Sequence, residues 1–247
     1  MPAPQKGNPV DATPFTHDSD PPVRGFLHCP EAANAPRADA VVLTHGAGSN
    51  CQAPLLIALA KAFAANGITA LRCDLPYRQK RPHGPPFPSE AARDRQGLRN
   101  AVEALKAWKA NLAEAHGHAP LRRVVLGGHS YGGRQATMLA ADDPGVAGGL
   151  LLTSYPLHPP GQPSRLRTDH FPALRVDALF VQGTRDPFGS IGEIEQALRL
   201  IPARTSLVPV ENAGHDLGGK SSVKPLSGVI VEAFLTFFPQ APDTASP

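Results

Sequence analysis

A glycine-flanked serine near the middle of the chain constrains the fold more than any other feature. The apolar run Arg123–Leu126 leads into Gly127–Gly133, where Ser130 stands between two pairs of glycines. Residues 134–141 then have a composition that favours a helix. At a sharp strand-to-helix turn the backbone segments come very close, so the positions around the serine have no room for a Cβ atom. The segment therefore predicts a strand, a tight turn and a helix, with Ser130 at the turn.

Ser130 lies in the sequence Gly-His-Ser-Tyr-Gly, which matches the nucleophile-elbow pattern in the context of strand, turn and helix that the pattern requires. Such a turn exposes the serine Oγ at a helix N-terminus, where partial positive charge favours a developing anion. A serine hydroxyl is a poor nucleophile at neutral pH, so it needs a base to accept its proton and an acid to orient that base. Because the pattern also occurs by chance, the case for catalysis depends on finding those partners elsewhere in the chain.

Short apolar runs alternate with amphipathic stretches along most of the chain. This alternation predicts an α/β fold with a doubly wound, mostly parallel sheet. The segment between Ser154 and Asp177 is too short for a large cap domain. The expected strands cover residues 23–31 (an edge strand), 38–44, 68–75, 123–126, 146–154, 178–182 and 206–210, and the expected helices cover residues 54–66, 90–115, 134–141, 191–201 and 223–238.

The length of 247 residues suits one large α/β domain, which we assign to residues 23–239. Residues 1–22 and 240–247 contain many proline and polar residues and little to bury, so we expect both to be disordered tails. The formal net charge of +3 comes without a long basic run, which argues against nucleic acid as a partner.

Other sequence features bear on the environment of the protein. No apolar stretch approaches the length of a bilayer span, so we expect no membrane partner. Met1 is followed by polar, proline-rich sequence, unlike a secretory signal. Cys29, Cys51 and Cys73 are widely spaced and lack a CxxC pattern, so we expect reduced thiols in a cytoplasmic protein. The histidines lack metal-ligand spacing and no GxGxxG follows a strand, so we expect neither a metal nor an organic cofactor.

The expected base and acid both follow Ser130 in the chain. Asp186 comes just after the strand 178–182, and His215 comes just after the strand 206–210. Because the carboxyl ends of parallel strands meet at one edge of the sheet, we expect both side chains near the serine. The sequence therefore predicts Ser130, Asp186 and His215 as the catalytic residues.

Both partners have alternatives. Asp186 precedes a proline and could simply begin a turn, in which case Asp169 in the preceding loop is the rival acid. Asp177 precedes its strand and so belongs to the opposite edge of the sheet. His215 could be an ordinary loop histidine, and the neighbouring Asp216 is better suited to capping.

A tetrahedral oxyanion needs backbone N–H donors. We expect one from Tyr131, the residue after the nucleophile, and one from Ala47, in the loop after the strand 38–44. His45 at the start of that loop is expected mainly to brace it. Basic and aromatic residues at the same edge would bind an anionic substrate if they converge, although loop-bracing and solvated charges are the alternative for most of them. The candidates for substrate contact are His45, Arg72, Tyr77, His158 and Arg167.

Together these residues resemble the α/β-hydrolase superfamily, and in particular its small lidless members near the dienelactone-hydrolase type. The order Ser, Asp, His is the order of that superfamily. Leu43–Gly48, Gly132–Arg134, Tyr155–Gly161 and Gln182–Asp186 further resemble the subgroup of predicted hydrolases that includes the testis-expressed and non-specific-lethal-complex proteins. Dienelactone hydrolases use a cysteine nucleophile, whereas this elbow carries Ser130, which favours ester hydrolysis.

We therefore expect a serine hydrolase that cleaves small carboxylic esters or thioesters through a Ser-His-Asp triad and an acyl-enzyme intermediate. Its partner would be a small-molecule ester, bound in an open cleft. One alternative is a catalytically silent interaction protein, which the resemblance to chromatin-complex proteins implies. The complete set of Ser130, Asp186 and His215 argues against it. Another alternative is an acyltransferase or perhydrolase that uses the same triad.

Overall fold

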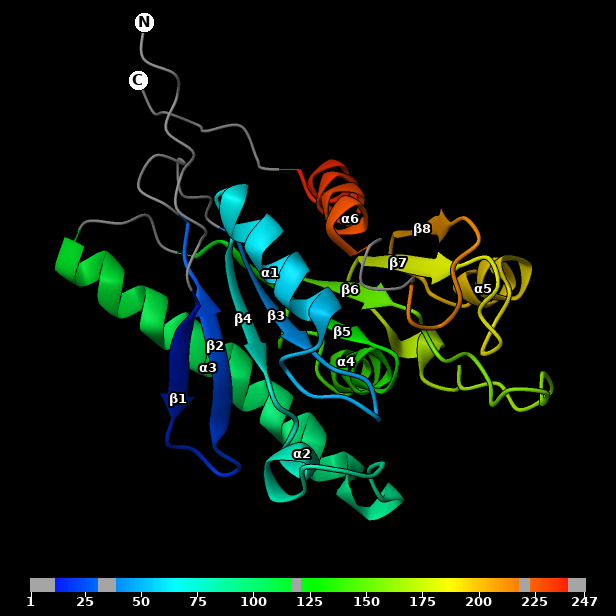
Figure 1. Ribbon diagram of the computed structural model, residues 1–247, viewed down its shortest axis with the longest axis horizontal. Helices are drawn as coiled ribbons and strands as arrows, with labels where there is room; N and C mark the ends of the chain where they lie inside the picture. The colour runs from blue at the N-terminus through cyan, green and yellow to red at the C-terminus, as the bar shows by residue number, and fades with distance from the viewer. Residues whose placement is uncertain (1–11, 31–38, 117–120, 218–222, 240–247) are drawn as a thin grey trace, which may run out of the picture.

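An eight-stranded sheet forms the centre of the structure (Figure 1). The computed structural model describes residues 12–30, 39–116, 121–217 and 223–239. In their order across the sheet, the strands are β1 (Thr13–His17), β2 (Val23–His28), β4 (Thr69–Cys73), β3 (Asp39–Thr44), β5 (Arg123–His129), β6 (Gly149–Thr153), β7 (Ala178–Gly183) and β8 (Thr205–Val210). β2 pairs antiparallel with β1 and with β4, and all other neighbours are parallel.

Helices cover both faces of the sheet (Figure 1). Two of them lie on one face, α1 (Pro54–Ala65) and α6 (Val223–Phe237). The opposite face carries α3 (Ala91–His116), α4 (Tyr131–Asp142) and α5 (Ile191–Leu198). Three short helices lie in connections, namely α2 (Pro76–Lys80) and the 3-10 helices η1 (Pro88–Glu90) and η2 (Phe171–Ala173).

The central strands are apolar on both sides because helices cover both faces. In β3, Val41 and Leu43 belong to the core under α1 and α6, and Val42 belongs to the core under α3 and α4. Side chains along a strand point alternately to the two faces, so a strand between two helix layers needs a continuous apolar run. All six residues of β3 are buried accordingly.

The direction of winding changes between β3 and β5. From β3 the chain passes through α1 to β4 on one side, and from β5 it passes through α4 to β6 on the other side. β3 and β5 themselves are parallel neighbours. Because the two connections leave in opposite directions, a crevice forms at the carboxyl ends of these strands, where ligands of α/β proteins bind. The loops after β3 and β5 meet there.

The predicted fold class is confirmed as α/β with a doubly wound, mostly parallel sheet. Each predicted strand and helix corresponds to an element of the structure, with shifted ends. Residues 154–177, which are all described, contain no helix other than the short η2, so this connection forms no large cap over this edge of the sheet.

Several predictions for the N-terminal part are wrong. Residues 13–17, expected in a disordered tail, form β1, and the expected edge strand lies inside the sheet as β2. Only Phe15 of β1 is buried, so this strand has too weak an apolar pattern to be recognised. The segment expected as a loop after β4 contains α2, which buries Tyr77. The ends of the expected tails, residues 1–11 and 240–247, lie outside the described residues.

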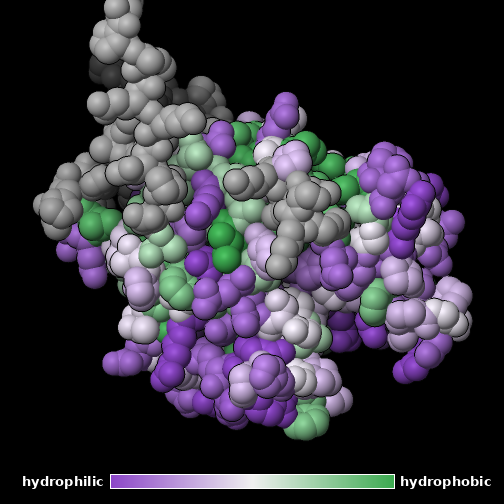
Figure 2. Space-filling view, in the orientation of Figure 1, coloured by the Kyte–Doolittle hydropathy of each residue, from purple (hydrophilic) through white to green (hydrophobic). Residues whose placement is uncertain are grey.

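The face shown in Figure 2 is largely hydrophilic, above all around α2 and the start of α3 at its lower edge. Large apolar side chains that remain exposed lie on separate segments, as is ordinary for a protein surface. They are Phe87, Leu166, Leu200 and Val229. In the parts of the chain that the structure describes, no helix has both the length and the apolar character to cross a bilayer.

Glycines let β5 and α4 approach closely at the turn between them. A Cβ atom on Gly128 would lie 2.5 Å from backbone atoms of Gly132 and Gly133. A Cβ atom on Gly132 would lie 2.6 Å from the carbonyl oxygen of His45. Because these neighbours are backbone atoms, they cannot move aside without displacing α4 or the end of β3.

The substitution Gly132→Ala tests this close approach. The added Cβ must displace the backbone after β3, so we expect the free energy of unfolding to fall by about 1–3 kcal/mol in urea unfolding. Gly228→Ala is the matched control, because Gly228 lies within α6 and a Cβ there has nothing within 4 Å. That variant should gain about 0.5–1 kcal/mol from better helix propensity. Equal stability of the two variants would contradict the argument.

Candidate active site

Ser130 occupies the sharp turn between β5 and α4. Its backbone has φ 52° and ψ −115°, a conformation that residues with a side chain rarely adopt. The Ser130 N–H donates to the carbonyl of Thr153 in β6 at 2.9 Å, and its carbonyl accepts from the Arg134 N–H at 3.0 Å. Backbone strain of this kind persists where the surroundings fix it, and it is concentrated at functional sites.

Ser130, His215 and Asp186 form a continuous chain of hydrogen bonds. His215 Nε2 lies 2.8 Å from Ser130 Oγ. His215 Nδ1 lies 2.9 and 3.0 Å from the two carboxylate oxygens of Asp186. Since the carboxylate accepts the proton on Nδ1, Nε2 is free to accept the proton of the serine hydroxyl. The loops after β5, β7 and β8 thus bring together the three residues that the sequence predicts.

Two further donors hold the Asp186 side chain, which is fully buried. Its carboxylate accepts a hydrogen bond from Gln182 Nε2 at 2.9 Å and another from the Phe188 N–H at 2.9 Å. A buried carboxylate needs such donors because burial removes its hydration. The rival acid, Asp169, is exposed, and the carboxylate in contact with His215 is that of Asp186.

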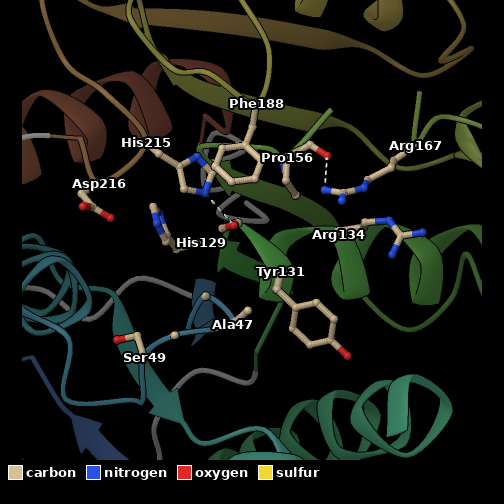
Figure 3. A pocket seen from close by; sticks show the side chains of 13 residues that line it. Ala47, Ser49, His129, Tyr131, Arg134, Pro156, Arg167, Phe188, His215 and Asp216 are labelled. Atoms are coloured by element: carbon tan, nitrogen blue, oxygen red, sulfur yellow. Dashed lines mark hydrogen bonds between the residues drawn. The ribbon is translucent and has the colours of Figure 1, made fainter. Parts of the chain in front are cut away.

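Two aromatic rings flank the imidazole of His215 (Figure 3). The ring centroid of Phe188 lies 4.1 Å away at an interplanar angle of 32°, and that of His129 lies 5.4 Å away. Burial, followed by the nearby His215, lowers the pKa of His129 to about 4, so this ring adds no positive charge at neutral pH. Phe188 is not recognisable from the sequence, because no motif marks the residues after the Asp186 turn.

The loop after β3 forms another side of the pocket. Ala47 and Tyr131, the predicted sources of oxyanion N–H donors, both line it. His45 is fully buried. Its Nε2 accepts from the Leu75 N–H at 3.1 Å, so its Nδ1 carries the proton and donates to the Gly46 carbonyl at 2.9 Å. Burial lowers the pKa of His45, which agrees with a neutral ring that braces the loop.

Side chains of α2 hold the carbonyl groups of the same loop. Tyr77 Oη donates to the Ala47 carbonyl at 2.9 Å and to the Gly46 carbonyl at 3.2 Å. Arg78 donates to the Ala47 carbonyl at 2.9 Å and to the Ser49 carbonyl at 2.7 Å. Because these carbonyls are occupied, the peptide planes of the loop are fixed.

A buried carboxylate links α2 to the turn at the serine. Asp94 of α3 accepts from Tyr131 Oη at 2.8 Å and from the Tyr77 N–H at 3.0 Å. The rings of Tyr77 and Tyr131 pack edge to face, with centroids 5.8 Å apart. Burial raises the pKa of Asp94. The Asp94 carboxylate therefore positions both Tyr131, which follows the serine, and Tyr77, which holds the loop after β3.

Four of the five residues predicted to contact the substrate make contacts inside the protein instead. For these four, the prediction of substrate contact is corrected. His45 and Tyr77 brace the loop after β3, as described above. Arg72 donates to His28 Nε2 at 3.0 Å, and His158 Nδ1 lies 2.8 Å from the carbonyl of the residue that follows it. All four are buried, and none of them lines the pocket.

The pocket at this edge of the sheet has a volume of about 510 Å³, in the usual range of small-molecule sites. Arg167, the fifth candidate, lines it. Arg134 of α4 also lines it and was not among the predicted binding residues. Arg134 could have been recognised from its spacing of four residues from Ser130. This spacing places the two residues on the same side of α4 at its start. Among the described residues, no group of three or more His, Cys, Asp and Glu is arranged to hold a metal ion.

A serine at a strand-to-helix elbow, on a doubly wound sheet, defines the class of α/β-hydrolase folds. The chain belongs to the alpha/beta hydrolase family, because the family model of the alpha/beta hydrolase domain matches residues 37–233. The predicted relationship to that superfamily is thereby confirmed. Membership of the testis-expressed subgroup remains a prediction.

Solved structures of similar fold agree with this assignment. A dienelactone hydrolase from Anabaena variabilis has a TM-score of 0.68 at 20% identity, covering 93% of this chain and 99% of its own. XC6422 from Xanthomonas campestris, a serine hydrolase without a lid, has a TM-score of 0.68 at 17% identity, covering 95% and 99%. Est1E from Butyrivibrio proteoclasticus has a TM-score of 0.64 at 13% identity, covering 92% and 99%. At these identities the similarity is one of fold.

The substitution Tyr77→Phe tests whether α2 fixes the loop after β3. Without the hydroxyl, the Ala47 and Gly46 carbonyls are held less firmly, so we expect the reaction of Ser130 with a fluorophosphonate to slow about tenfold. The rate constant is measured by intact mass, with thermal unfolding in parallel. Gln79→Met is the control, because it removes hydrogen bonds from α2 that do not involve this loop. Equal slowing in both variants would contradict a specific role of Tyr77.

The buried contact between Arg72 and His28 predicts acid sensitivity. Burial, followed by the positive charge of Arg72, lowers the pKa of His28 from 6.5 to about 4. As the pH falls from about 6.5 towards 4, the unfolded chain gains a proton that the folded chain does not, so the free energy of unfolding decreases. In His28→Gln, the amide oxygen still accepts from Arg72. Between pH 7 and 4.5 this variant should lose about 1–3 kcal/mol less than the original protein in urea unfolding.

His17→Gln, on the exposed side of β1, is the control for the acid series. It should follow the original protein at each pH. Parallel pH profiles for the original protein and His28→Gln would contradict the prediction.

Proposed function

We propose that this α/β hydrolase cleaves carboxylic ester or thioester bonds with Ser130 as nucleophile, His215 as base and Asp186 as the orienting acid. The observation that carries the proposal is the hydrogen-bond chain from Ser130 Oγ through His215 to the buried carboxylate of Asp186. Similar structures named as a serine hydrolase without a lid and as an esterase domain support it.

In the first step, Ser130 Oγ attacks the carbonyl carbon while His215 Nε2 takes its proton. Asp186 keeps the Nδ1 proton in place and stabilises the imidazolium that forms. The N–H groups of Ala47 and Tyr131 donate to the oxyanion, and these groups are positioned before the substrate arrives.

In the second step, the tetrahedral intermediate collapses and His215 gives its proton to the departing alcohol or thiol. The acyl group then remains on Ser130 Oγ. A water molecule attacks this acyl-enzyme as His215 takes one of its protons, and the same proton returns to Ser130 when the carboxylic acid leaves. The sum is one water consumed for each ester bond cleaved.

We also propose a cytoplasmic location. Cys29, Cys51 and Cys73 are all free thiols, and unpaired cysteines are typical of reducing compartments. Burial raises the pKa of Cys51 to about 12, so this thiol is unreactive.

Labelling with a fluorophosphonate, read by intact mass, tests the proposed function. We expect one adduct on the original protein and none on Ser130→Ala, whose turnover of a short ester should be lower by a factor of about 10⁴ or more. Asp186→Asn should lower turnover by a factor of about 10⁴, because the amide favours the wrong histidine tautomer. Ser206→Ala, on β8 and outside the pocket, is the control and should label normally.

The absence of an adduct on the folded protein would contradict the proposal and favour a catalytically silent interaction protein. Product analysis with a competing alcohol or peroxide separates hydrolysis from acyl transfer. Ester or peracid products in excess of the free acid would make the protein an acyltransferase or perhydrolase.

A further inference from the structure

Two arginine side chains lie at one end of the pocket. Arg134 comes from the first turns of α4, and Arg167 comes from the connection between β6 and β7. Figure 3 shows both guanidinium groups on one side of the pocket and His215 with Asp216 on the other side. The pocket is therefore positive at one end and carries the proposed base and a carboxylate at the other.

Neither guanidinium is paired with a carboxylate among the residues that the structure describes. Arg134 Nε is buried and has no hydrogen-bond partner there. Some arginines elsewhere in the fold are paired with a carboxylate, Arg81 with Glu90 and Arg123 with Asp39, although the Nε atoms of these two also lack a hydrogen-bond partner. Arg134 and Arg167 differ from such pairs because both line the pocket without a carboxylate partner, so an anion bound there would supply the missing counter-charge.

Arg167 is fixed in position by its neighbours. Its backbone N–H donates to the Leu157 carbonyl at 2.8 Å, and its carbonyl accepts from Tyr155 Oη at 2.8 Å. Its Nη1 donates to the Pro156 carbonyl at 3.1 Å, which leaves its other donors available. Burial, followed by the positive charge of Arg134, lowers the pKa of Arg167. The two like charges are thus held close enough to repel each other, and a bound anion would relieve that repulsion.

The proposed chemistry decides which part of a substrate reaches the arginines. The leaving group must lie near His215 Nε2, which protonates it, and the oxyanion must lie near the N–H groups of Ala47 and Tyr131. The acyl chain takes the remaining direction, away from His215. Asp216, on the His215 side, disfavours a negative charge on the leaving group.

We propose that the substrate is a monoester or monothioester of a short dicarboxylic acid, whose free carboxylate binds Arg134 and Arg167 while its esterified carbonyl lies at Ser130. A planar carboxylate suits the fork of donors that each guanidinium presents. The pocket volume of about 510 Å³ accommodates a short acyl chain. This assignment rests on the proposed function.

The reaction then balances as a simple hydrolysis. Ser130 Oγ forms a bond to the esterified carbonyl carbon, the bond to the leaving oxygen or sulfur breaks, and that atom takes the serine proton by way of His215. Water supplies the hydroxyl that releases the acyl group from Ser130. The products are the dicarboxylic acid and an alcohol or thiol, and nothing is oxidised or reduced.

The decisive comparison is between monoethyl glutarate and ethyl 5-methylhexanoate, which have similar acyl shapes and differ in charge. We expect kcat/KM for monoethyl glutarate to be at least about tenfold higher. Arg134→Gln and Arg167→Gln should each lower that value by about 10–100-fold, mainly through KM, and should change the neutral ester less than about threefold. Arg165→Gln removes a neighbouring exposed charge outside the pocket, so it should change neither.

Binding of glutarate to Ser130→Ala, measured by calorimetry, keeps the test independent of turnover. We expect binding that weakens by about 10-fold or more when Arg134→Gln or Arg167→Gln is added. Equal turnover of the two esters, equal losses on both esters in the variants, or no glutarate binding to a protein whose Ser130 labels normally would overturn the assignment. Failure of the fluorophosphonate to label Ser130 would overturn the proposed function, and the substrate with it.

Discussion

The close backbone approach between β5 and α4 is the contact on which the rest of the site depends. Gly128 and Gly132 leave no space for a side chain at the turn, so α4 begins directly against the strand. This geometry fixes Ser130 in a strained conformation with its hydroxyl 2.8 Å from His215. His215 is carried by a separate loop after β8 and cannot follow a displaced serine. A small shift of α4 would therefore break a contact made by residues far apart in the sequence.

Polar residues behind the pocket keep its walls in place. Tyr77 and Arg78 occupy the carbonyl groups of the loop after β3, and Asp94 joins that support to Tyr131. Each buried polar group in this set has a partner, so the set adds rigidity without leaving unsatisfied donors. In the sequence, the basic residues after β4 suggest substrate binding. In the structure, Arg78 of this segment binds the carbonyl groups of the loop after β3 instead.

The sheet and the positions of Ser130, Asp186 and His215 were predictable because they depend on local patterns. Apolar runs mark buried strands, and the end of a parallel strand marks the edge where its next residues lie. The burial of the Arg72 and His158 side chains was not predictable. The sequence pattern places each residue near one edge of the sheet, but it does not specify where its side chain points. β1 was missed because a single buried phenylalanine gives no periodicity. Arg134 was missed although its spacing from Ser130 is a local signal, because nothing in the sequence shows that it shares the pocket with Arg167, which is distant along the chain.

The short connection between β6 and β7 forms no large cap over the pocket, and this has a kinetic consequence for the proposed reaction. Substrate entry and product release need no opening of a cap in this connection, so the proposed chemistry rather than the movement of such a cap would set the turnover rate. Solvent would also reach the proposed acyl-enzyme throughout its lifetime. Dissolved nucleophiles would then compete for that intermediate in proportion to their concentration and reactivity. The product would therefore depend on the composition of the surrounding solution as well as on the residues of the pocket.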